Sequence, residues 1–337
     1  MTKPEQETVD PRPEVLRVEN LSVAFGTKGD LLALQNVSLT IHAGEVVALV
    51  GESGCGKSLT ALSVMGLLPP EAHVLGGSVK LGGKETIGIS ERELRDYRGA
   101  VMGMVFQDAM VALNPLLAVG RQIDEVLRIH TNLSRSERRA KVIALLEAVG
   151  VPDPANRLRQ LPHQFSGGLR QRIMIAMALI AEPQLIIADE PTTALDVTIQ
   201  SQILEVLKEI TQSRGTAVLF ITHDMGVVAE IADRVVVMYG GRVVESAEVV
   251  DAFVAPAHPY TDALLRSVPR IDTPLGVDLL VIPGTVPALG AVSVGCPFRP
   301  RCVYATEECL KMPPLESIRP HQMVACWHPR VNSEEQK

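Results

Sequence analysis

The stretch "GESGCGKS", Gly51 to Ser58, decides the fold of this chain. It directly follows the apolar, β-branched run "EVVALV" and opens a helical pattern from Lys57 to Leu68, which two prolines end. A strand, a G-x-x-x-x-G-K-S loop and a helix in this order are typical of a phosphate-binding loop. The glycines let the backbone wrap around a phosphate, and the helix N-terminus adds partial positive charge. We therefore expect Lys57 to neutralise the β and γ phosphates of a nucleotide and Ser58 to hold Mg²⁺.

Two more apolar runs indicate that the strand before this loop belongs to a mostly parallel sheet. "QLIIADE", Gln184 to Glu190, and "AVLFITHD", Ala217 to Asp224, are rich in β-branched residues and end in polar ones, as buried parallel strands do. Short alternating runs between Val15 and Ile41 predict antiparallel strands. Helical patterns cover the ranges Arg121 to His130, Ser134 to Val149, Gly168 to Ala181 and Ile199 to Ser213. Strands that alternate with helices predict an α/β fold.

Composition shifts divide the chain into three parts. Polar, proline-rich residues 1–14 predict a disordered tail, residues 15–269 a nucleotide-binding domain, and residues 270–337 a loop-rich C-terminal extension punctuated by prolines. Inside the domain, residues from about 115 to 168 lack strand patterns. We expect them to form a helical subdomain.

Charge and hydropathy restrict the partners of the chain. The net charge of −7 argues against nucleic acid, because phosphate binding needs a basic face. The longest apolar run, Ile173 to Ala181, is far shorter than the roughly 20 residues that cross a bilayer. The first residues carry no apolar secretion signal. We therefore expect a cytosolic chain whose membrane role is exerted through a partner.

An acidic pair, Asp189 and Glu190, ends the second apolar run. At the end of a buried strand, Asp189 can reach Mg²⁺ through its water shell, and Glu190 can polarise the attacking water. The same pair could instead cap the helix that follows.

A third motif, "FSGGLRQR" from Phe165 to Arg172, lies between the phosphate loop and the acidic pair. With these three motifs the chain resembles the ATP-binding cassette ATPases, from about Val15 to Pro269. The resemblance implies a RecA-like parallel sheet core, an antiparallel β subdomain, a helical subdomain, and nucleotides held between two subunits. In such a dimer Ser166, Gly167 and Gly168 act on the partner's ATP, because a hydroxyl and N–H groups at a helix start form donors for a γ phosphate.

The resemblance also assigns ATP contacts beyond Lys57 and Ser58. Phe25 occupies the position of the aromatic residue that stacks on adenine, although an ordinary core side chain on a strand fits the same pattern. Leu169 replaces the commoner glutamine after the signature glycines, which weakens one side-chain contact at most. The other expected ATP-binding residues are Gly51, Ser53, Gly54, Cys55, Gly56, Leu59 and Asp189.

Three further positions match the catalytic and interface residues of that family. Gln107 in "MVFQD" resembles the glutamine that touches Mg²⁺ and the attacking water, with a buried structural glutamine as the alternative. His223 in "FITHD" resembles the histidine that contacts the γ phosphate and orients Glu190, with a satisfied core histidine as the alternative. Asp196 in "TTALD" resembles the loop aspartate that crosses the dimer interface.

The residues from about 255 to 329 resemble one particular type of cassette ATPase. The order "HPYTDALLRSVP", "IPGTVP" and a cysteine-rich tail, from about Ala255 to Pro329, is similar to the di- and oligopeptide, or nickel, importer ATPases. This similarity implies a second, different ATPase subunit, two transmembrane permease subunits, and an extracytoplasmic solute-binding protein that acts indirectly. It implies a peripheral position on the cytoplasmic face of the inner membrane. The alternatives are an importer of nickel or another small solute, and a non-transport cassette ATPase.

Four of the five cysteines gather in the tail: Cys296, Cys302, Cys309 and Cys326, with 5, 6 and 16 residues between them. Disulfides do not suit a chain that works in reducing cytosol. Zinc sites use cysteine pairs spaced by roughly two to four residues, although His321 and His328 leave a mixed zinc site open. The similarity to peptide-importer tails favours a structural four-iron–four-sulfur (4Fe-4S) cluster, with Zn²⁺ as the alternative.

The fifth cysteine, Cys55, lies inside the phosphate loop. A helix N-terminus lowers the pKa of a thiol and favours alkylation. A small, inert packing residue is the alternative interpretation.

Overall fold

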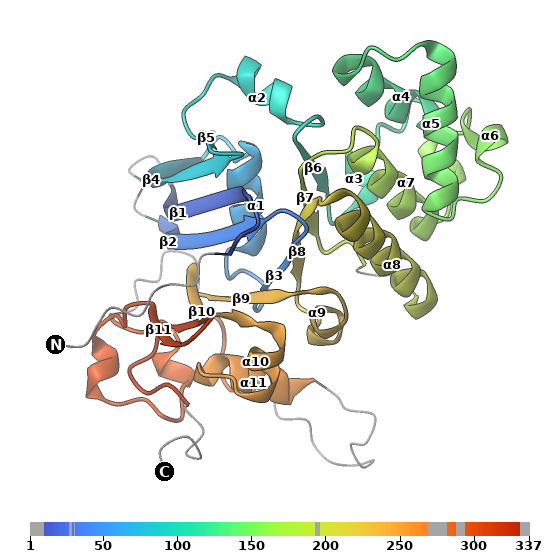
Figure 1. The fold of residues 1–337 in the computed structure, drawn as a ribbon. Coiled ribbons are helices and arrows are strands. Elements are labelled where there is room, and N and C mark those ends of the chain that lie inside the picture. Colours follow the sequence, from blue (N-terminus) through green and yellow to red (C-terminus); the bar gives the residue numbers. More distant parts are fainter. Residues whose placement is uncertain are drawn as a thin grey trace.

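The chain folds around two β-sheets (Figure 1). The computed structural model describes residues 10–26, 29, 31–192, 196–268, 282–287 and 294–330. In the first sheet the strand order is β2-β1-β4-β5, and every pair is antiparallel. These strands are β1 (Glu14–Phe25), β2 (Leu31–His42), β4 (Ala72–Leu81) and β5 (Lys84–Glu85). The predicted antiparallel strands are therefore confirmed.

The second sheet carries the phosphate loop. Its order among the described residues is β11-β12-β10-β9-β3-β8-β7-β6, and the strands from β9 to β6 run parallel. The strands are β3 (Val46–Val50), β6 (Met102–Val105), β7 (Leu185–Asp189), β8 (Ala217–Thr222), β9 (Arg234–Tyr239), β10 (Arg242–Glu248), β11 (Glu316–Arg319) and β12 (Gln322–Val324). The predicted α/β fold with a mostly parallel sheet is confirmed.

Both faces of the parallel strands are buried, which explains their continuous apolar runs. Successive side chains of a strand point to opposite faces. On β7, Leu185 and Ile187 therefore join the core that includes α1 and the antiparallel sheet, whereas Ile186 and Ala188 join the core under the helices on the other face. A strand buried on both faces needs apolar residues at every position.

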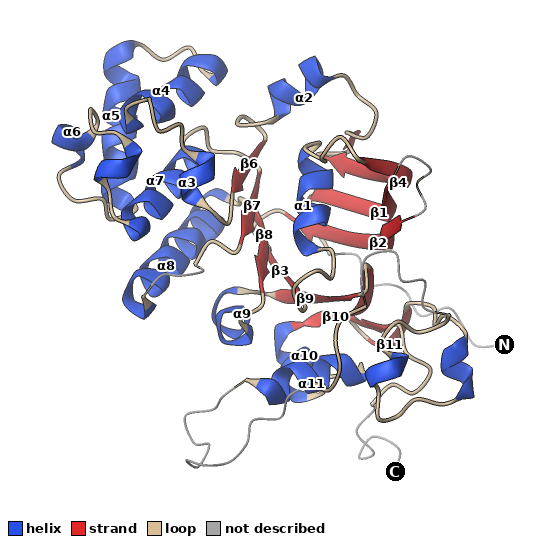
Figure 2. Cartoon of the chain, turned by 180° about the vertical axis from the view of Figure 1, so that it is seen from behind, coloured by secondary structure: helices blue, strands red, loops and turns tan. Residues whose placement is uncertain are grey.

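The helices form groups around the two sheets (Figures 1 and 2). Helix α1 packs between them, α3 to α7 form a separate group beside β6 and β7, and α9 to α11 lie near β9 and β10. The helices are α1 (Lys57–Met65), α2 (Glu91–Tyr97), α3 (Ala109–Ala112), α4 (Val119–His130), α5 (Arg135–Ala148), α6 (Pro154–Arg157), α7 (Gly167–Leu179), α8 (Val197–Arg214), α9 (Met225–Ile231), α10 (Val249–Val254) and α11 (Pro259–Ser267). Among the described residues, no helix combines the length and hydropathy that a membrane span requires.

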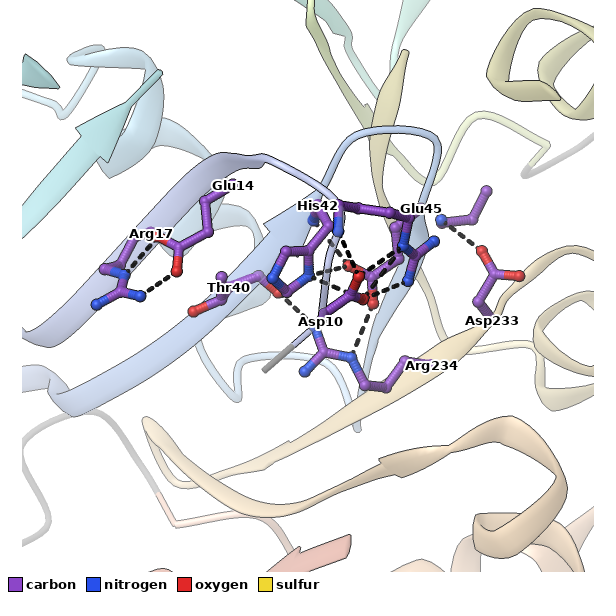
Figure 3. Close-up of polar contacts among 10 residues, drawn as sticks. Asp10, Glu14, Arg17, Thr40, His42, Glu45, Asp233 and Arg234 are labelled. Carbon is purple, nitrogen blue, oxygen red and sulfur yellow. Dashed lines mark hydrogen bonds and ion pairs between the residues drawn. The ribbon is translucent and has the colours of Figure 1, made fainter. Parts of the chain in front are cut away.

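A buried polar cluster joins the two sheets where β3 begins (Figure 3). The carboxylate of Glu45, only 3% exposed, accepts hydrogen bonds from the backbone N–H of His42 at 2.8 Å and from Nε of Arg234 at 2.9 Å. Asp233 accepts the N–H of Val46 at 2.8 Å. Since a buried charge needs such partners, β2, β3 and β9 are fixed to one another. The opposite end of β3 then holds the phosphate loop in place.

Both ends of the chain contain described structure where the sequence predicted a disordered tail or loops. Residues 1–9 lie outside the described part, but the tail predicted for residues 1–14 overlaps described structure from Asp10 onward, and β1 begins at Glu14. The extension predicted to be loop-rich contributes β11 and β12, and β12 pairs with β10 in the large sheet. These strands are short, and their positions depend on contacts from distant parts of the chain.

Candidate functional site

The phosphate loop joins β3 to α1 and requires its glycines. Gly51 and Gly56 have φ angles of 147° and 107°, a region that L side chains rarely adopt. A Cβ on Gly51 would lie 2.3 Å from the carbonyl oxygen of Met238, and one on Gly56 would lie 2.6 Å from Cδ2 of Leu34. The close packing of this loop against β2 and β9 therefore excludes any larger residue at these two positions.

Lys57 points back along the loop from the first turn of α1. Its side chain is buried, and Nζ donates to the carbonyl oxygens of Gly51 at 2.7 Å and Glu52 at 3.1 Å. A cavity of about 430 Å³ adjoins this lysine, a volume suited to a small-molecule site. Its lining residues are Val50, Gly51, Glu52, Ser53, Lys57, Gln107, Glu190, His223, Met225 and Leu264.

Three of the predicted catalytic side chains meet at one wall of this cavity. Glu190 follows β7, Gln107 follows β6, and His223 follows β8. Because carboxyl ends of adjacent parallel strands lie together, the residues converge: Nε2 of Gln107 donates to Glu190 at 3.0 Å, and Nδ1 of His223 lies 3.2 Å from the other carboxylate oxygen. Gln107 and His223 are exposed toward the site. Neither is the buried structural residue that the sequence left as an alternative.

Ser58 and Asp189 form a second pair of oxygen groups beside the loop. The hydroxyl of Ser58 donates to the carboxylate of Asp189 at 3.1 Å, and Asp189 is 6% exposed. Burial raises the pKa of Asp189 above its usual value, although the Ser58 hydrogen bond opposes this shift. Hydroxyl and carboxylate oxygens are ligands that Mg²⁺ accepts in phosphate sites. The residues present therefore fit the predicted magnesium position.

The signature residues do not line the cavity beside the phosphate loop of their own chain. Ser166 caps α7, and its hydroxyl accepts the N–H of Leu169 at 3.4 Å. Ser166 and Gly167 are exposed, Gly168 is half-buried, and none of the three lines the cavity at Lys57. Their predicted action on a partner's ATP stays a prediction.

Asp196 stands at the start of α8. Its carboxylate accepts the N–H of Ile199 at 2.9 Å, and the residue is exposed. The structure therefore gives Asp196 a helix-capping contact, and an interface role for it stays a prediction.

Of the predicted ATP contacts, Gly51, Ser53 and Lys57 line the cavity, whereas Gly54, Cys55, Gly56, Ser58 and Asp189 do not. Phe25 and Leu59 do not line it either. Each is half-buried against the core of the antiparallel sheet. Cys55 is fully buried in that core. Burial raises the pKa of the Cys55 thiol, with the nearby Lys57 opposing the shift only in part. The expectation of a lowered pKa at this helix N-terminus was wrong, and the inert packing interpretation fits.

The four tail cysteines line one small cavity against α11. Its lining includes Cys296, Cys302, Cys309 and Cys326 together with His258, and all five cysteines of the chain are free. Among the described residues, however, no three His, Cys, Asp or Glu side chains form a group that could hold a metal ion. The structure thus gathers the four thiols without the ligand geometry that the predicted iron–sulfur or zinc site requires.

His258 contributes a buried polar atom to this cavity. Its Nδ1 accepts the N–H of Tyr260 at 3.0 Å, so the imidazole proton lies on Nε2. That Nε2 is buried and has no hydrogen-bond partner within the described structure. Burial lowers the pKa of His258 to about 3, which keeps the ring neutral. A sulfur acceptor in the cavity would satisfy the Nε2–H donor.

Sequence reasoning missed part of the site at Lys57. Glu52 occupies a variable position of the loop pattern, and Leu264 lies on α11, far along the chain. No local pattern marks either residue. Only the packing of α11 beside the phosphate loop brings them together.

Comparisons with known proteins agree with this geometry. A family model described as "ABC transporter" matches residues 34–193, and one described as "Oligopeptide/dipeptide transporter, C-terminal region" matches residues 244–309. The chain is 46% identical over 332 residues to the oligopeptide transport ATP-binding protein OppD of Salmonella typhimurium, covering 98% of each chain. It is 51% identical over 317 residues to the dipeptide transport ATP-binding protein DppD of Bacillus subtilis, covering 93% of this chain and 94% of that protein.

A solved structure shows the same fold in its cassette part. The dimeric, post-hydrolysis structure of the ATP-binding cassette MJ0796 bound to ADP and phosphate is 29% identical, with a TM-score of 0.63. The match covers 69% of this chain and 98% of that one.

Proposed function

Since the chain belongs to the ATP-binding cassette ATPases of the oligopeptide and dipeptide transporter family, we propose that it hydrolyses ATP to energise the uptake of peptides through a membrane importer. One observation carries the proposal: the cavity beside Lys57 also contains the Gln107–Glu190–His223 cluster. A phosphate-binding loop and a carboxylate placed to polarise water thus share one site. The peptide solute is supported by the relatives and by the C-terminal region match.

The polar residues in and beside the cavity divide the steps of this reaction among them. The loop N–H groups and Lys57 bind the β and γ phosphates, and Ser58, Gln107 and, through water, Asp189 would hold Mg²⁺. Bound Mg²⁺ would neutralise charge that develops on the phosphates. Glu190 polarises the attacking water, and Gln107 and His223 orient Glu190 through the contacts at 3.0 Å and 3.2 Å. His223 also contacts the γ phosphate.

The exposed signature extends the proposal to a dimer. Ser166, Gly167 and Gly168 act on the ATP of a partner cassette, and Asp196 lies at the shared interface. We propose that the partner is a second, different ATPase and that both dock on two transmembrane permease subunits, with a solute-binding protein acting indirectly. The chain is then peripheral, on the cytoplasmic face of the inner membrane. Phe25 at the end of β1 and Leu59 on α1, both half-buried against the same core, would contact the nucleotide.

Glu190→Gln tests the assignment of the base in the assembled ATPase pair. The substitution removes the charge that polarises water but keeps the groups that bind nucleotide. We expect ATP turnover at this site to fall about a thousandfold, while ATP remains bound and the dimer becomes more stable. Turnover is measured by phosphate release, and trapping by nucleotide retained after gel filtration.

Glu182→Gln is the matched control, because Glu182 precedes β7 at the opposite end from Glu190 and pairs with Lys141 and Arg214. It should leave turnover unchanged. If Glu190→Gln hydrolysed ATP at the parental rate, Glu190 would not be the base.

We further propose that Cys296, Cys302, Cys309 and Cys326 hold a 4Fe-4S cluster, with Zn²⁺ as the alternative. Two observations support it: the four thiols line one cavity, and His258, which lines the same cavity, has a buried Nε2 without a hydrogen-bond partner among the described residues. The side chains would have to turn toward one centre, because their described arrangement does not hold a metal ion. Thiolate ligation would cross-link a tail that has little core of its own.

Anaerobic purification of the full chain tests this centre. We expect brown protein with iron, sulfide and broad absorbance near about 400 nm. Cys302→Ala should lose the colour, whereas Cys55→Ala should keep it, because Cys55 does not line the tail cavity. Zinc without iron or sulfide would show that the four cysteines bind Zn²⁺ instead of a 4Fe-4S cluster. Protein without any metal would contradict the site.

A further inference from the structure

An ion pair joins the cysteine-bearing tail to the phosphate loop. Arg301 lies in a short 3-10 helix (Arg299–Arg301) directly before Cys302, and Glu52 is the second residue of the loop. Nη1 and Nη2 of Arg301 contact the two carboxylate oxygens of Glu52 at 2.7 and 3.1 Å, across 249 residues of sequence. A two-point guanidinium–carboxylate contact fixes orientation as well as distance.

The surroundings of Arg301 differ from those of an ordinary surface ion pair. Its side chain is only 5% exposed. Nε donates to the carbonyl oxygen of Pro283 at 2.7 Å, Nη2 to that of Ile282 at 3.2 Å, and Nη1 to the hydroxyl of Tyr239 at 3.2 Å. The guanidinium also stacks over the Tyr239 ring at 5.8 Å. These contacts hold Arg301 on several sides. Arg301 therefore fixes the position of the Glu52 carboxylate.

A second contact holds the backbone of the same loop residue. The N–H of Glu52 donates to the hydroxyl of Tyr260 on α11 at 2.8 Å. Tyr260 is fully buried and packs T-shaped against Tyr239, with ring centroids 4.7 Å apart. It also packs in a tilted arrangement against Phe298, at 5.2 Å. Two residues before Tyr260, His258 lines the cysteine cavity. Side chain and main chain of Glu52 are thus both held from the tail side of the molecule.

The contact chain continues from Glu52 to the phosphate-binding lysine. The carbonyl oxygen of Glu52 accepts a hydrogen bond from Nζ of Lys57 at 3.1 Å. A displacement of Glu52 would therefore change the position of the group that neutralises the phosphates. Such a contiguous network of buried hydrogen bonds can couple two sites.

We propose that Arg301 is a positioning residue for the phosphate loop, and that through Glu52 it makes nucleotide affinity depend on the state of the cysteine-bearing tail. The proposal rests on the proposed function, because it takes the loop as the nucleotide site. Coupling between two binding sites is reciprocal. Nucleotide binding must then stabilise the tail to the same extent that an ordered tail strengthens nucleotide binding.

Nucleotide titration of the purified full chain tests the positioning role. Arg301→Met should weaken MgADP binding by roughly tenfold, within the usual range of coupling between sites. Arg301→Lys keeps the charge but loses the planar fork, so it should fall between the parent and Arg301→Met. In the assembled ATPase, Arg301→Met should raise KM for ATP and leave kcat nearly unchanged, because the residue does not touch the reacting atoms.

Two further variants separate positioning from general damage to the fold. Arg299→Met removes the same charge from the same short helix, and no contact between Arg299 and Glu52 occurs among the described residues. It should bind MgADP like the parent. Glu52→Gln should weaken binding as Arg301→Met does, and the double variant should be no weaker than either single one, because all three remove one interaction.

Amide hydrogen exchange in the tail gives a readout independent of nucleotide affinity. Residues 296–302 contain Arg301 and lie in the described part of the tail. With exchange mass spectrometry, MgADP should slow exchange of this segment severalfold in the parent and not in Arg301→Met.

The outcomes distinguish failure of the proposed function from failure of the positioning role alone. If the parent binds no nucleotide, the proposed function fails and the coupling fails with it. If the parent binds MgADP and Arg301→Met binds it equally well, only the positioning role is overturned. Equal weakening by Arg299→Met, additive losses in the double variant, or tail exchange that MgADP does not slow in the parent would also overturn it. Should Arg301→Met fail to fold, Arg301→Lys and Glu52→Gln decide the question.

Discussion

The thiol of Cys55 lies one turn or less from the N-terminus of α1, yet it is closed off from solvent. Two effects on its pKa oppose each other. A helix terminus stabilises a charge by about 0.3 to 1 kcal/mol, which is less than about one pKa unit. Complete burial raises the pKa of an acid by up to about 3 to 5 units. Burial therefore outweighs the helix terminus, and the pKa of Cys55 rises.

Slow alkylation of Cys55 follows from this balance. Because burial both raises the thiol pKa and blocks access, Cys55 should react with a maleimide far more slowly than a free thiol, with or without MgATP. Ser53→Cys is the matched control, since Ser53 is exposed in the same loop and its replacement should react quickly. Peptide-resolved mass spectrometry measures both rates. Rapid labelling of Cys55 in the folded parent would show that this side chain is not enclosed.

At the scale of elements, one carboxylate on β10 organises the C-terminal part. Glu245 is fully buried and accepts hydrogen bonds from the N–H groups of Ala257 at 2.9 Å and His258 at 2.8 Å, and from Nε2 of Gln322 at 2.9 Å. It thereby connects β10 to β12 and to the turn before α11. Together with the backbone pairing of β12 and β10, this contact fixes the position of the tail strands.

Glu245→Ala should release β12 and the turn before α11. The substitution leaves three donors without their acceptor, and each buried unsatisfied group costs about 1 to 3 kcal/mol. We expect a loss of about 3 kcal/mol or more in the free energy of unfolding, with faster amide hydrogen exchange in β12 and at residues 257–260. Urea denaturation and exchange mass spectrometry measure the two effects.

Glu248→Ala is the control on the same strand. Glu248 is exposed and makes no side-chain cap bond to α10, so its loss should change stability by less than about 0.5 kcal/mol. If Glu245→Ala were as stable as Glu248→Ala, the carboxylate would not hold the tail strands.

At the scale of the whole molecule, the sequence predicts the parallel core well and the tail poorly. Runs such as Leu185–Asp189 are apolar at every position before the final aspartate, so they indicate strands without knowledge of their neighbours. The strands Glu316–Arg319 and Gln322–Val324 are short and polar, and they depend on Glu245, which is distant in sequence. The strand Met102–Val105 is also too short to stand out.

The candidate site was likewise predictable from the sequence only in part. Lys57, Glu190 and His223 follow strands that the sequence indicates, so their convergence could be expected from the parallel order alone. The contacts of Glu52 with Arg301 and Tyr260 could not, because these residues share no local pattern and meet only when the tail folds back on the loop. From the sequence alone there was no reason to expect that the signature residues would not line the cavity of their own chain. Only the resemblance to the cassette ATPases predicted this.

The short pairing of β12 with β10 has a consequence for solubility. Without it, β10 would form the open edge of the large sheet and expose unpaired N–H and C=O groups, which can template pairing with another chain. Instead, Glu245 and Ser246 pair with Val324 and Met323, and the outermost strand becomes β11, which has four residues and carries Glu316 and Arg319. Short, charged edges resist strand addition. The extension therefore also protects this sheet against aggregation.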